Sequence, residues 1–431
     1  MAGHNQYQET LEFLYEKLPM FSHLGKVAYR ADLNNIIALC SLLGNPERKF
    51  RSVHIAGTNG KGSVSHMLAA IFQEAGYQTG LYTSPHLKDF RERIRVNGEM
   101  VEKDYVTEFV ARIKPVAAQI QPSFFEITVA MAFSYFVDKQ VDIAIVETGL
   151  GGRLDSTNII VPDLAVITNI SYDHQNILGN SLKQIAREKA GIIKTGVPVV
   201  IGEEQEEVAD IMIGQALQCS SPLFFADQEF QILSSEWYPD HLQVRVQSSD
   251  FQIANTYSMD LNGQYQAKNL LTVLSSCRHL TKSWNLSEQG IQSALSQVKK
   301  RTGLRGRWDQ VSSNPAIVMD VGHNESGIRE ICRQLDTMVY GSLHIVLGTV
   351  KDKDIHGILA ALPRSAQYYF CQAAIPRALG KEQLADKAGE FGLSGRVFAS
   401  SREALDAARE NASPADLILV CGSCFVVGEL I

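Results

Sequence analysis

The sequence predicts an α/β protein built from two parts, a larger one with a mostly parallel sheet and a smaller one that follows it. Short apolar runs alternate with helical patterns over residues 52–200, which is typical of a parallel sheet covered by helices. A basic, glycine-containing stretch interrupts this pattern at residues 299–307, and the alternation resumes after it. A chain of 431 residues is long enough for two or three domains.

The first part is expected to alternate strands and helices. We expect strands at 53–56, 79–82, 141–146, 164–168 and 197–201, and helices at 62–74, 103–118, 126–137 and 182–190. Residues 222–262 differ, because segments such as 243–247 alternate polar and apolar residues as antiparallel strands do. Helices are expected after them, at 264–279 and 287–297.

The stretch KKRTGLRGR, at Lys299–Arg307, is predicted to be an interdomain linker. We therefore predict a first domain over residues 1–298 and a smaller, Rossmann-like α/β domain over residues 308–431. The strands of the second domain are expected at 316–319, 343–347, 367–370, 396–398 and 417–420.

The composition argues against several classes of protein. The chain carries a formal net charge of -7, whereas proteins that bind nucleic acid broadly have a basic surface. No apolar run reaches the ~18 residues of a membrane span, and the N-terminus lacks the apolar core of a signal peptide. We expect a cytoplasmic monomer that binds neither nucleic acid nor membrane.

Seven cysteines scattered along the chain do not indicate a disulfide framework. Cys421 and Cys424 form a C-x-x-C pair, which is either a redox or metal pair or two buried structural thiols. Because Cys421 ends the apolar run LILV, buried thiols are the favoured interpretation.

A glycine-rich loop, GTNGKGS, lies between the strand VHIA and a helical pattern. Glycines let the backbone turn tightly and aim its N–H groups at phosphate oxygens, and a helix N-terminus favours negative charge. The order departs from G-x-x-x-x-G-K-[ST], so a glycine-rich turn with a solvated lysine is the alternative, but the strand–loop–helix context favours a phosphate loop. Its predicted ATP-binding residues are Gly57, Thr58, Asn59, Gly60, Lys61, Gly62 and Ser63, with Lys61 near the β- and γ-phosphates and Ser63 near Mg²⁺.

Polar side chains follow two further strands of the predicted sheet. Glu147 ends the apolar strand VDIAIV, and Asp173 and His174 follow the strand DLAVITNI. In a parallel α/β sheet the carboxyl ends of the strands form the edge where ligands bind. A carboxylate beside a triphosphate suits Mg²⁺, so these residues are candidates for a metal site.

Several segments, in one order along nearly the whole chain, resemble the folylpolyglutamate synthases of the Mur ligase superfamily. The first is HIAGTNGKGSVSHMLAAIFQEAGYQTGLYTSPHL, and the others are RERIRVNGE, FFEITVAMAF, VETGLGGRLDSTN, ITNISYDH, EKAGIIK, GRWD, DVGHNESG and GTVKDKD. The second-domain motif departs from the usual D-G-A-H-N-P, because Val321 replaces a glycine and Glu325 a proline.

The resemblance implies roles for particular residues. Ser84, Glu147 and His174 match magnesium ligands, and Lys189 matches a lysine that is carbamylated in relatives, which would make it an anionic ligand. Asn269, Arg307 and Asp320 match nucleotide-contacting positions, and His323 and Ser423 match positions of the glutamate pocket. The residues expected to take part in catalysis are Lys61, His174, Lys189, Asp320 and His323, with ATP and two Mg²⁺ as cofactors.

The activity implied by the resemblance is ATP-dependent ligation of L-glutamate to a folate, and also to dihydropteroate, through an acyl phosphate. In the loop after Glu147, Arg153 and Asp155 resemble the form found in bifunctional members. Asp155 would accept hydrogen bonds from the pterin, and Phe124 or Phe125 would stack on its ring; alternatively, Asp155 caps a loop and the phenylalanines fill the core.

Two other functions stay open on the sequence. One is another Mur-type amino-acid ligase, and the second is a P-loop ATPase or GTPase that acts as a switch or binding protein. The absence of an N-K-x-D segment disfavours a GTPase.

Overall fold

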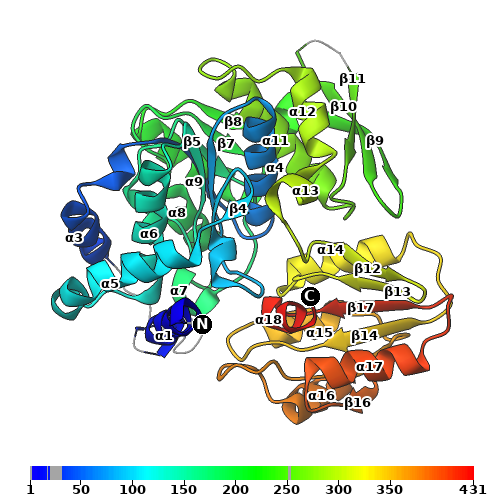
Figure 1. Cartoon of the computed structure of the whole chain (residues 1–431). Helices are drawn as coiled ribbons and strands as arrows, with labels where there is room; N and C mark the ends of the chain where they lie inside the picture. The colour runs from blue at the N-terminus through cyan, green and yellow to red at the C-terminus, as the bar shows by residue number, and fades with distance from the viewer. Residues whose placement is uncertain (1, 17, 20–31, 251–253) are drawn as a thin grey trace.

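The computed structural model describes residues 2–16, 18–19, 32–250 and 254–431. It has two lobes, a larger one from blue to green and a smaller one from yellow to red in Figure 1. The predicted α/β fold class, with a mostly parallel first sheet and a smaller second α/β unit, is confirmed. We call the elements up to residue 302 the N-terminal lobe and those from residue 309 onward the C-terminal lobe.

The N-terminal lobe contains an eight-stranded sheet in the order β4-β3-β2-β5-β1-β6-β7-β8. In this sheet β3 runs antiparallel to its two neighbours, β2 and β4, and the other neighbouring pairs are parallel. The strands are β1 (Arg51–Ala56), β2 (Thr79–Tyr82), β3 (Ile94–Val96), β4 (Glu99–Met100), β5 (Ile143–Glu147), β6 (Leu164–Ile167), β7 (Val199–Ile201) and β8 (Leu223–Phe225). The five strands predicted in this region correspond to β1, β2, β5, β6 and β7.

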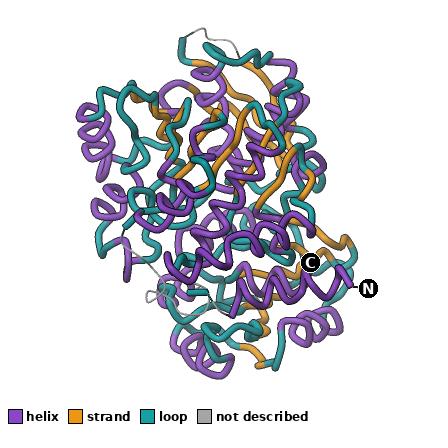
Figure 2. The backbone as a smooth tube through the Cα atoms, turned by 60° about the vertical axis from the view of Figure 1, so that its left-hand side comes forward, coloured by secondary structure: helices purple, strands orange, loops and turns teal. Residues whose placement is uncertain are grey.

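Helices cover both faces of this sheet, as the purple and orange segments of Figure 2 show. One face packs with α4 (Lys61–Glu74), α11 (Gln266–Leu280), α12 (Glu288–Leu295) and α13 (Val298–Thr302) around the core residues of β1 and β5. The other helices of the lobe are α1 (Ala2–Glu16), α3 (Asn34–Leu42), α5 (Lys103–Ile120), α6 (Phe124–Asp138), α7 (Gln175–Leu178), α8 (Leu182–Ala190), α9 (Glu206–Gln218) and α10 (Ala226–Glu229), with short 3₁₀ turns η2 (Pro46–Arg48), η3 (Phe90–Arg93) and η4 (Ser156–Ile159).

The predicted antiparallel region forms a separate three-stranded sheet. It contains β9 (Phe230–Trp237), β10 (Leu242–Ser248) and β11 (Ala254–Met259), with β10 in the centre. Alternate residues of β10, namely Leu242, Val244 and Val246, are buried in the same core as α4 and α11. The alternating pattern therefore reflects one face packed on the N-terminal lobe.

The basic stretch predicted as a linker starts as a helix rather than as extended chain. Residues Val298–Thr302 form α13, which ends at Gly303 with a left-handed φ of 69°. Val298 and Thr302 are buried, so α13 belongs to the N-terminal lobe. The connection between the lobes is thereby shortened to the residues between Gly303 and β12.

The C-terminal lobe contains a six-stranded sheet in the order β12-β13-β17-β14-β15-β16, in which only β12 is antiparallel. Its strands are β12 (Asp309–Ser313), β13 (Ala316–Met319), β14 (Leu343–Leu347), β15 (Gln367–Phe370), β16 (Gly395–Val397) and β17 (Leu417–Cys421). Its helices are α14 (Glu325–Leu335), α15 (Ile355–Ala361), α16 (Lys381–Glu390), α17 (Ser401–Asn411) and α18 (Cys424–Leu430).

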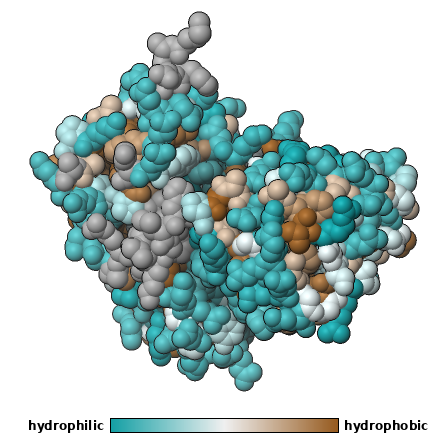
Figure 3. All heavy atoms as spheres, turned by 90° about the horizontal axis from the view of Figure 1, so that it is seen from below, coloured by the Kyte–Doolittle hydropathy of each residue, from teal (hydrophilic) through white to brown (hydrophobic). Residues whose placement is uncertain are grey.

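Hydrophilic residues predominate on the face drawn in Figure 3. Across the described residues, every helix is too short or too polar to span a bilayer.

Cys421 is buried in β17, Cys424 is partly buried at the start of α18, and neither is in a disulfide.

The close contact between β2 and α6 provides a test of the N-terminal core. A Cβ atom on Gly80 would lie 2.8 Å from Cδ1 of Phe136. We expect Gly80→Ala to lower the free energy of unfolding by about 1–3 kcal/mol through overpacking. Gly214→Ala, in α9 with open space around the new methyl group, is the control and should stabilise by up to about 1 kcal/mol. Urea unfolding measures both, and equal effects of the two changes would contradict the packing argument.

Candidate active site

The phosphate loop joins the buried strand β1 to α4. Gly57 and Gly60 have φ values of 149° and 84°, which side chains rarely allow. A Cβ atom on Gly57 would lie 1.9 Å from the hydroxyl of Thr168, and one on Gly60 would lie 2.3 Å from Oδ1 of Asn269. The loop is thus packed against β6 and α11 from outside, with the N-terminus of α4 at its end.

Lys61, the first residue of α4, folds back over this loop. Its Nζ donates to the carbonyl oxygens of Gly57 and Thr58, both at 3.1 Å. Burial lowers the pKa of Lys61, and the nearby carboxylates of Glu147 and Asp173 oppose that shift. The ammonium group therefore sits inside the loop, where an anion such as a phosphate would be favoured.

Glu147 lies at the carboxyl end of β5 and is only 4% exposed. Its Oε2 accepts a hydrogen bond from the backbone N–H of Ser84 at 3.1 Å. Burial raises the pKa of Glu147, and the charges of Lys61 and Arg307 counter this effect. A Cβ on Gly62 would meet Nη2 of Arg307 at 3.4 Å and Oε2 of Glu147 at 3.8 Å, so both side chains meet at the start of α4.

Lys189 reaches the same loop from α8. Its Nζ donates to the carbonyl oxygen of Gly57 at 2.7 Å, and the side chain is buried. Burial and the neighbouring charge of Lys61 lower the pKa of Lys189 to about 7. A large fraction of this amine is therefore neutral near pH 7, unlike that of a surface lysine.

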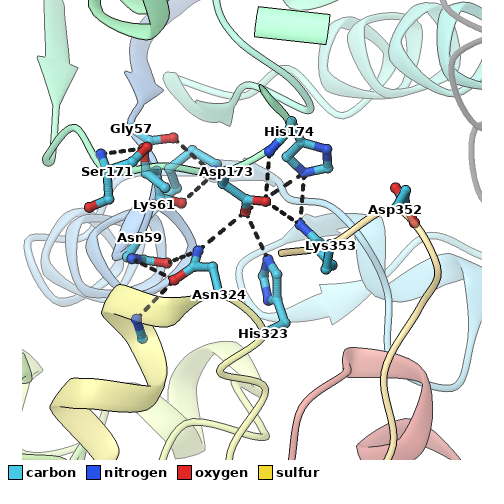
Figure 4. Close-up of polar contacts among 12 residues, drawn as sticks. Gly57, Asn59, Lys61, Ser171, Asp173, His174, His323, Asn324, Asp352 and Lys353 are labelled. Carbon is cyan, nitrogen blue, oxygen red and sulfur yellow. Dashed lines mark hydrogen bonds and ion pairs between the residues drawn. The ribbon is translucent and has the colours of Figure 1, made fainter. Parts of the chain in front are cut away.

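Asp173, in the loop after β6, is the centre of a cluster that both lobes build (Figure 4). Its carboxylate lies 2.6 Å from Nζ of Lys353 and 3.3 Å from Nε2 of His323, both from the C-terminal lobe. Nζ of Lys353 is also 3.1 Å from Nε2 of His174. Burial alone would raise the pKa of Asp173, but Lys353 and the two imidazoles outweigh it and hold that pKa well below its ordinary value. Burial and Lys353 together lower the pKa of His174.

A pair of asparagines joins the phosphate loop to the C-terminal lobe beside this cluster. Nδ2 of Asn59 donates to Oδ1 of Asn324 at 3.2 Å, and Nδ2 of Asn324 donates back to Oδ1 of Asn59 at 2.9 Å. Asn324 also caps α14 by accepting from the backbone N–H of Gly327, and it donates to Asp173 at 3.2 Å. One side chain therefore connects the cap of α14, the phosphate loop and Asp173.

Asp320 follows β13 and is also held by groups from both lobes. It accepts from the hydroxyl of Tyr265 at 2.6 Å and from the backbone N–H groups of Trp308 at 2.8 Å and Gly322 at 2.8 Å. Burial raises the pKa of Asp320. On the nucleotide side, Asn269 of α11 donates to Gln266, which in turn donates to the hydroxyl of Ser63.

Many of these groups line one cavity of about 520 Å³ between the lobes, whereas Lys353, Asn324 and Gln266 lie behind its wall. The predicted residues at its wall are Gly57, Thr58, Asn59, Gly60, Lys61, Gly62, Ser63, Ser84, Glu147, His174, Lys189, Asn269, Arg307, Asp320 and His323. Residues far apart in the sequence therefore meet where the carboxyl ends of strands from both sheets face each other.

Two family models match the chain, the Mur ligase middle domain over residues 55–277 and the Mur ligase glutamate ligase domain over residues 306–424. The chain is 31% identical to the dihydrofolate synthase/folylpolyglutamate synthase of Bacillus subtilis, over 98% of each chain. It is 32% identical to a probable bifunctional folylpolyglutamate synthase/dihydropteroate synthase of Haloferax volcanii, over 98% of this chain but 50% of that longer protein. The chain belongs to the folylpolyglutamate synthase/dihydrofolate synthase family of Mur ligases.

Among solved structures, the family member from Mycobacterium tuberculosis, complexed with ADP and AMPPCP, superposes with a TM-score of 0.88 at 31% identity. The match covers 99% of this chain and 98% of that one. The arrangement of the two lobes is thus shared with a family member whose structure contains nucleotides.

The residues predicted for the pterin lie away from the wall of this cavity. Asp155 is buried and accepts from the backbone N–H groups of Gly149, Leu150 and Thr157, so it closes its own loop and caps η4. Phe124 is buried in the core, and Phe125 lies under the same loop, 2.3 Å from where a Cβ on Gly149 would be. Arg153 is half-exposed and pairs with Glu188 at 2.8 Å. In this structure Asp155 and Phe125 support the loop and Phe124 fills the core, which is the structural alternative considered for Asp155 and the phenylalanines.

Ser423, predicted for the glutamate pocket, is 3% exposed and caps α18 by accepting from the backbone N–H of Phe425 at 3.1 Å. The neighbouring Cys424 lines the cavity instead. The departures Val321 and Glu325 leave the motif intact, because Asp320, His323 and Asn324 all reach the interface between the lobes.

Sequence reasoning assigned no role to Lys353, Asn324 or Tyr265. Lys353 follows β14, so the rule about the carboxyl ends of parallel strands, which selected Asp173, could have selected it too. Tyr265 gave no such signal, because its partner Asp320 is 55 residues away in the sequence.

The buried pair of Asp173 and Lys353 generates a prediction about stability. We expect Lys353→Met to lower the free energy of unfolding by about 3 kcal/mol, because it leaves the carboxylate of Asp173 buried beside fewer cations. The loss should be smaller when Asp173→Asn is already present, as a double-mutant cycle would measure. Lys351→Met, at an exposed neighbour, is the control and should change stability by less than about 0.5 kcal/mol. Identical losses in both backgrounds would show that the pair is not coupled.

Proposed function

We propose that this protein is an ATP-dependent ligase that joins L-glutamate to the carboxylate of a folate, and also to that of dihydropteroate. The observation that carries the proposal is the single cavity in which the phosphate loop and Glu147 of one lobe face Asp320 and His323 of the other. The names of the relatives, dihydrofolate synthase/folylpolyglutamate synthase, support the two acceptors.

The donors at the cavity suit a magnesium nucleotide. Mg²⁺ is usually held by one or two carboxylates together with phosphate oxygens and waters, and not by a cage of side chains. Glu147, the hydroxyls of Ser63 and Ser84, and His174 would hold magnesium, which supplies charge neutralisation to the phosphates.

The remaining chemistry needs positioning more than covalent catalysis. The γ-phosphoryl group of ATP passes to the acceptor carboxylate, and ADP leaves. The amine of glutamate then attacks the acyl phosphate, forming the amide and releasing phosphate. Lys61, whose Nζ lies over the phosphate loop, and Arg307, which reaches the start of α4, would stabilise the phosphoryl group during its transfer.

The C-terminal lobe would supply the glutamate site, with His323 at the wall of the cavity. His323 contacts Asp173 and lines the same cavity as Lys61. Ser423 would contribute by fixing the start of α18 rather than through a free hydroxyl, because that hydroxyl already caps the helix. Glutamate would thus be held by one lobe and the acyl phosphate by the other, so that the seating of the lobes brings them together.

An assay with separate acceptors tests the proposed function. We expect the purified protein to form ADP when ATP, glutamate and either dihydropteroate or a reduced folate are present together, and to form little when any one is left out. Lys61→Ala should lower the rate at least about 100-fold, because it removes the cation at the phosphate loop. Mass spectrometry of the products identifies the new amide.

Product with folate alone would remove the synthase half of the proposal and leave the ligase half. ADP formation that does not depend on glutamate would instead favour an ATPase switch. Turnover of a cell-wall peptide precursor alone would favour another Mur-type ligase.

We also propose that Lys189 is carbamylated. Its neutral amine would attack CO₂, form an N–C bond and release a proton, which yields a carbamate anion. The buried position and the lowered pKa favour this reaction, because the nucleophile is the neutral amine. The carbamate oxygens would provide an anionic ligand for magnesium where the ammonium group would repel it.

Since the pKa of Lys189 is about 7, carbamate occupancy should rise between about pH 6 and about pH 8. Carbon-13 NMR in labelled bicarbonate measures it directly. Lys189→Ala should remove the signal and lower the ligation rate about 100-fold, and a short carboxylic acid should restore part of the rate. Lys183→Ala, on the exposed side of the same helix, is the control. A carbamate signal that survives in Lys189→Ala would contradict the assignment.

A further inference from the structure

The loop after β2 reaches from the N-terminal lobe into the C-terminal lobe. Its Leu87 side chain packs against the apolar core that contains Val321, Val427 and Ile317. Leu87 is thus a partly buried residue of one lobe that packs on the core of the other.

The groove that receives Leu87 is formed by two glycines and two valines. A Cβ on Gly306 would lie 3.2 Å from Cδ1 of Leu87, 3.0 Å from Cγ1 of Val321 and 3.4 Å from Cγ1 of Val427. A Cβ on Gly428 of α18 would lie 2.2 Å from the carbonyl oxygen of Leu87. We call Gly306, Val321, Val427 and Gly428 the Leu87 socket. Val321, which departs from the usual glycine of the motif, is therefore one of its walls.

At its other end, the same loop is held by a hydrogen bond to Glu147 at the cavity. The backbone N–H of Ser84, three residues before Leu87, donates to Oε2 of Glu147 at 3.1 Å. The carboxylate of Glu92 accepts from the backbone N–H groups of Leu87, Lys88 and Asp89 at 2.8, 3.1 and 2.8 Å. Only Pro85 and His86 separate the two anchored points, so a shift of Leu87 moves Ser84.

We propose that Leu87 is a positioning residue that couples the seating of the C-terminal lobe to the orientation of Ser84 and Glu147. When the socket closes on Leu87, the loop holds the Ser84 N–H against Glu147 and leaves its remaining carboxylate lone pairs directed to the cavity. When the socket opens, that hydrogen bond is no longer held. Binding of the magnesium nucleotide by the N-terminal lobe then depends on the contact of Leu87 with the C-terminal lobe, which would also bind glutamate.

A cationic side chain lies close to Glu147 at the cavity. A Cβ on Gly62 would lie 3.4 Å from Nη2 of Arg307 and 3.8 Å from Oε2 of Glu147, so Arg307 offers this carboxylate an alternative partner on the cavity side. A hydrogen bond from the backbone is what distinguishes one orientation from another. This inference rests on the proposed role of Glu147 at magnesium, but its test does not require glutamate ligation.

Two variants test the coupling. Leu87→Ala empties the socket, and Gly428→Ala places a methyl group against the carbonyl of Leu87. Electron paramagnetic resonance measures Mn²⁺ binding in the presence of a non-hydrolysable ATP analogue. We expect each variant to weaken Mn²⁺ binding about tenfold, while Leu87→Met, which conserves volume, stays within about twofold of the original protein.

The matched control is Gly389→Ala in α16, where an added methyl group meets open space. An alanine is intrinsically better than a glycine in a helix, so a loss that occurs only at Gly428 must come from the contact with Leu87. Thermal unfolding shows whether each variant is folded. Folded Leu87→Ala and Gly428→Ala proteins with unchanged Mn²⁺ binding would overturn the proposal and leave Leu87 a packing residue. A wild-type protein that binds Mn²⁺ with nucleotide but ligates no glutamate would refute the proposed function and not the coupling.

Discussion

The buried carboxylate of Asp173 is the interaction on which the assembly of the two lobes depends. A carboxylate in this position is costly unless cations and hydrogen-bond donors surround it. Within its own lobe Asp173 has His174 beside it, whereas Lys353, His323 and Asn324 come from the C-terminal lobe. The direct ion pair of Asp173 therefore forms only when the two lobes are in contact, and that contact brings the proposed phosphate and glutamate sites into one cavity.

The phosphate loop is also held by contacts from both lobes. Its glycines leave room for Thr168 and Asn269, and its Asn59 pairs with Asn324 across the interface. The loop that would hold the nucleotide is consequently packed by β6, by α11 and by the cap of α14. A change in the position of the C-terminal lobe would therefore act on the N-terminal lobe at two places. It would displace Asn59 through Asn324, and Ser84 through Leu87.

The sequence predicted the strands of both sheets well where they were buried, because continuous apolar runs mark a strand that is covered on both faces. It missed the hairpin of β3 and β4, whose turn is Asn97-Gly98 with both residues at positive φ, a pattern that predicts a two-residue hairpin.

The carboxyl-end rule placed Glu147, Asp173 and His174 at the cavity. It could not show that Asp155 turns back into its own loop, since a capping aspartate and a ligand-binding aspartate look alike in a sequence. The position of Leu87 was also beyond reach, because its socket combines the linker, the loop after β13 and α18.

Two lysines, Lys61 of α4 and Lys189 of α8, meet at the phosphate loop, and their proximity favours a chemical modification of one of them. Lys61 and Lys189 both donate to the carbonyl oxygen of Gly57, at 3.1 and 2.7 Å. Two ammonium groups on one carbonyl repel each other in a buried site, so one of them gains by becoming neutral. Burial acts on both, and the charge of Lys61 is an additional cause of the lowered pKa of Lys189. Converting Lys189 to a carbamate would replace the repulsion by attraction, which would keep Lys61 charged for the phosphates. Lys61, which would bind phosphate, thus lowers the pKa of Lys189 and thereby favours its conversion to an anionic ligand.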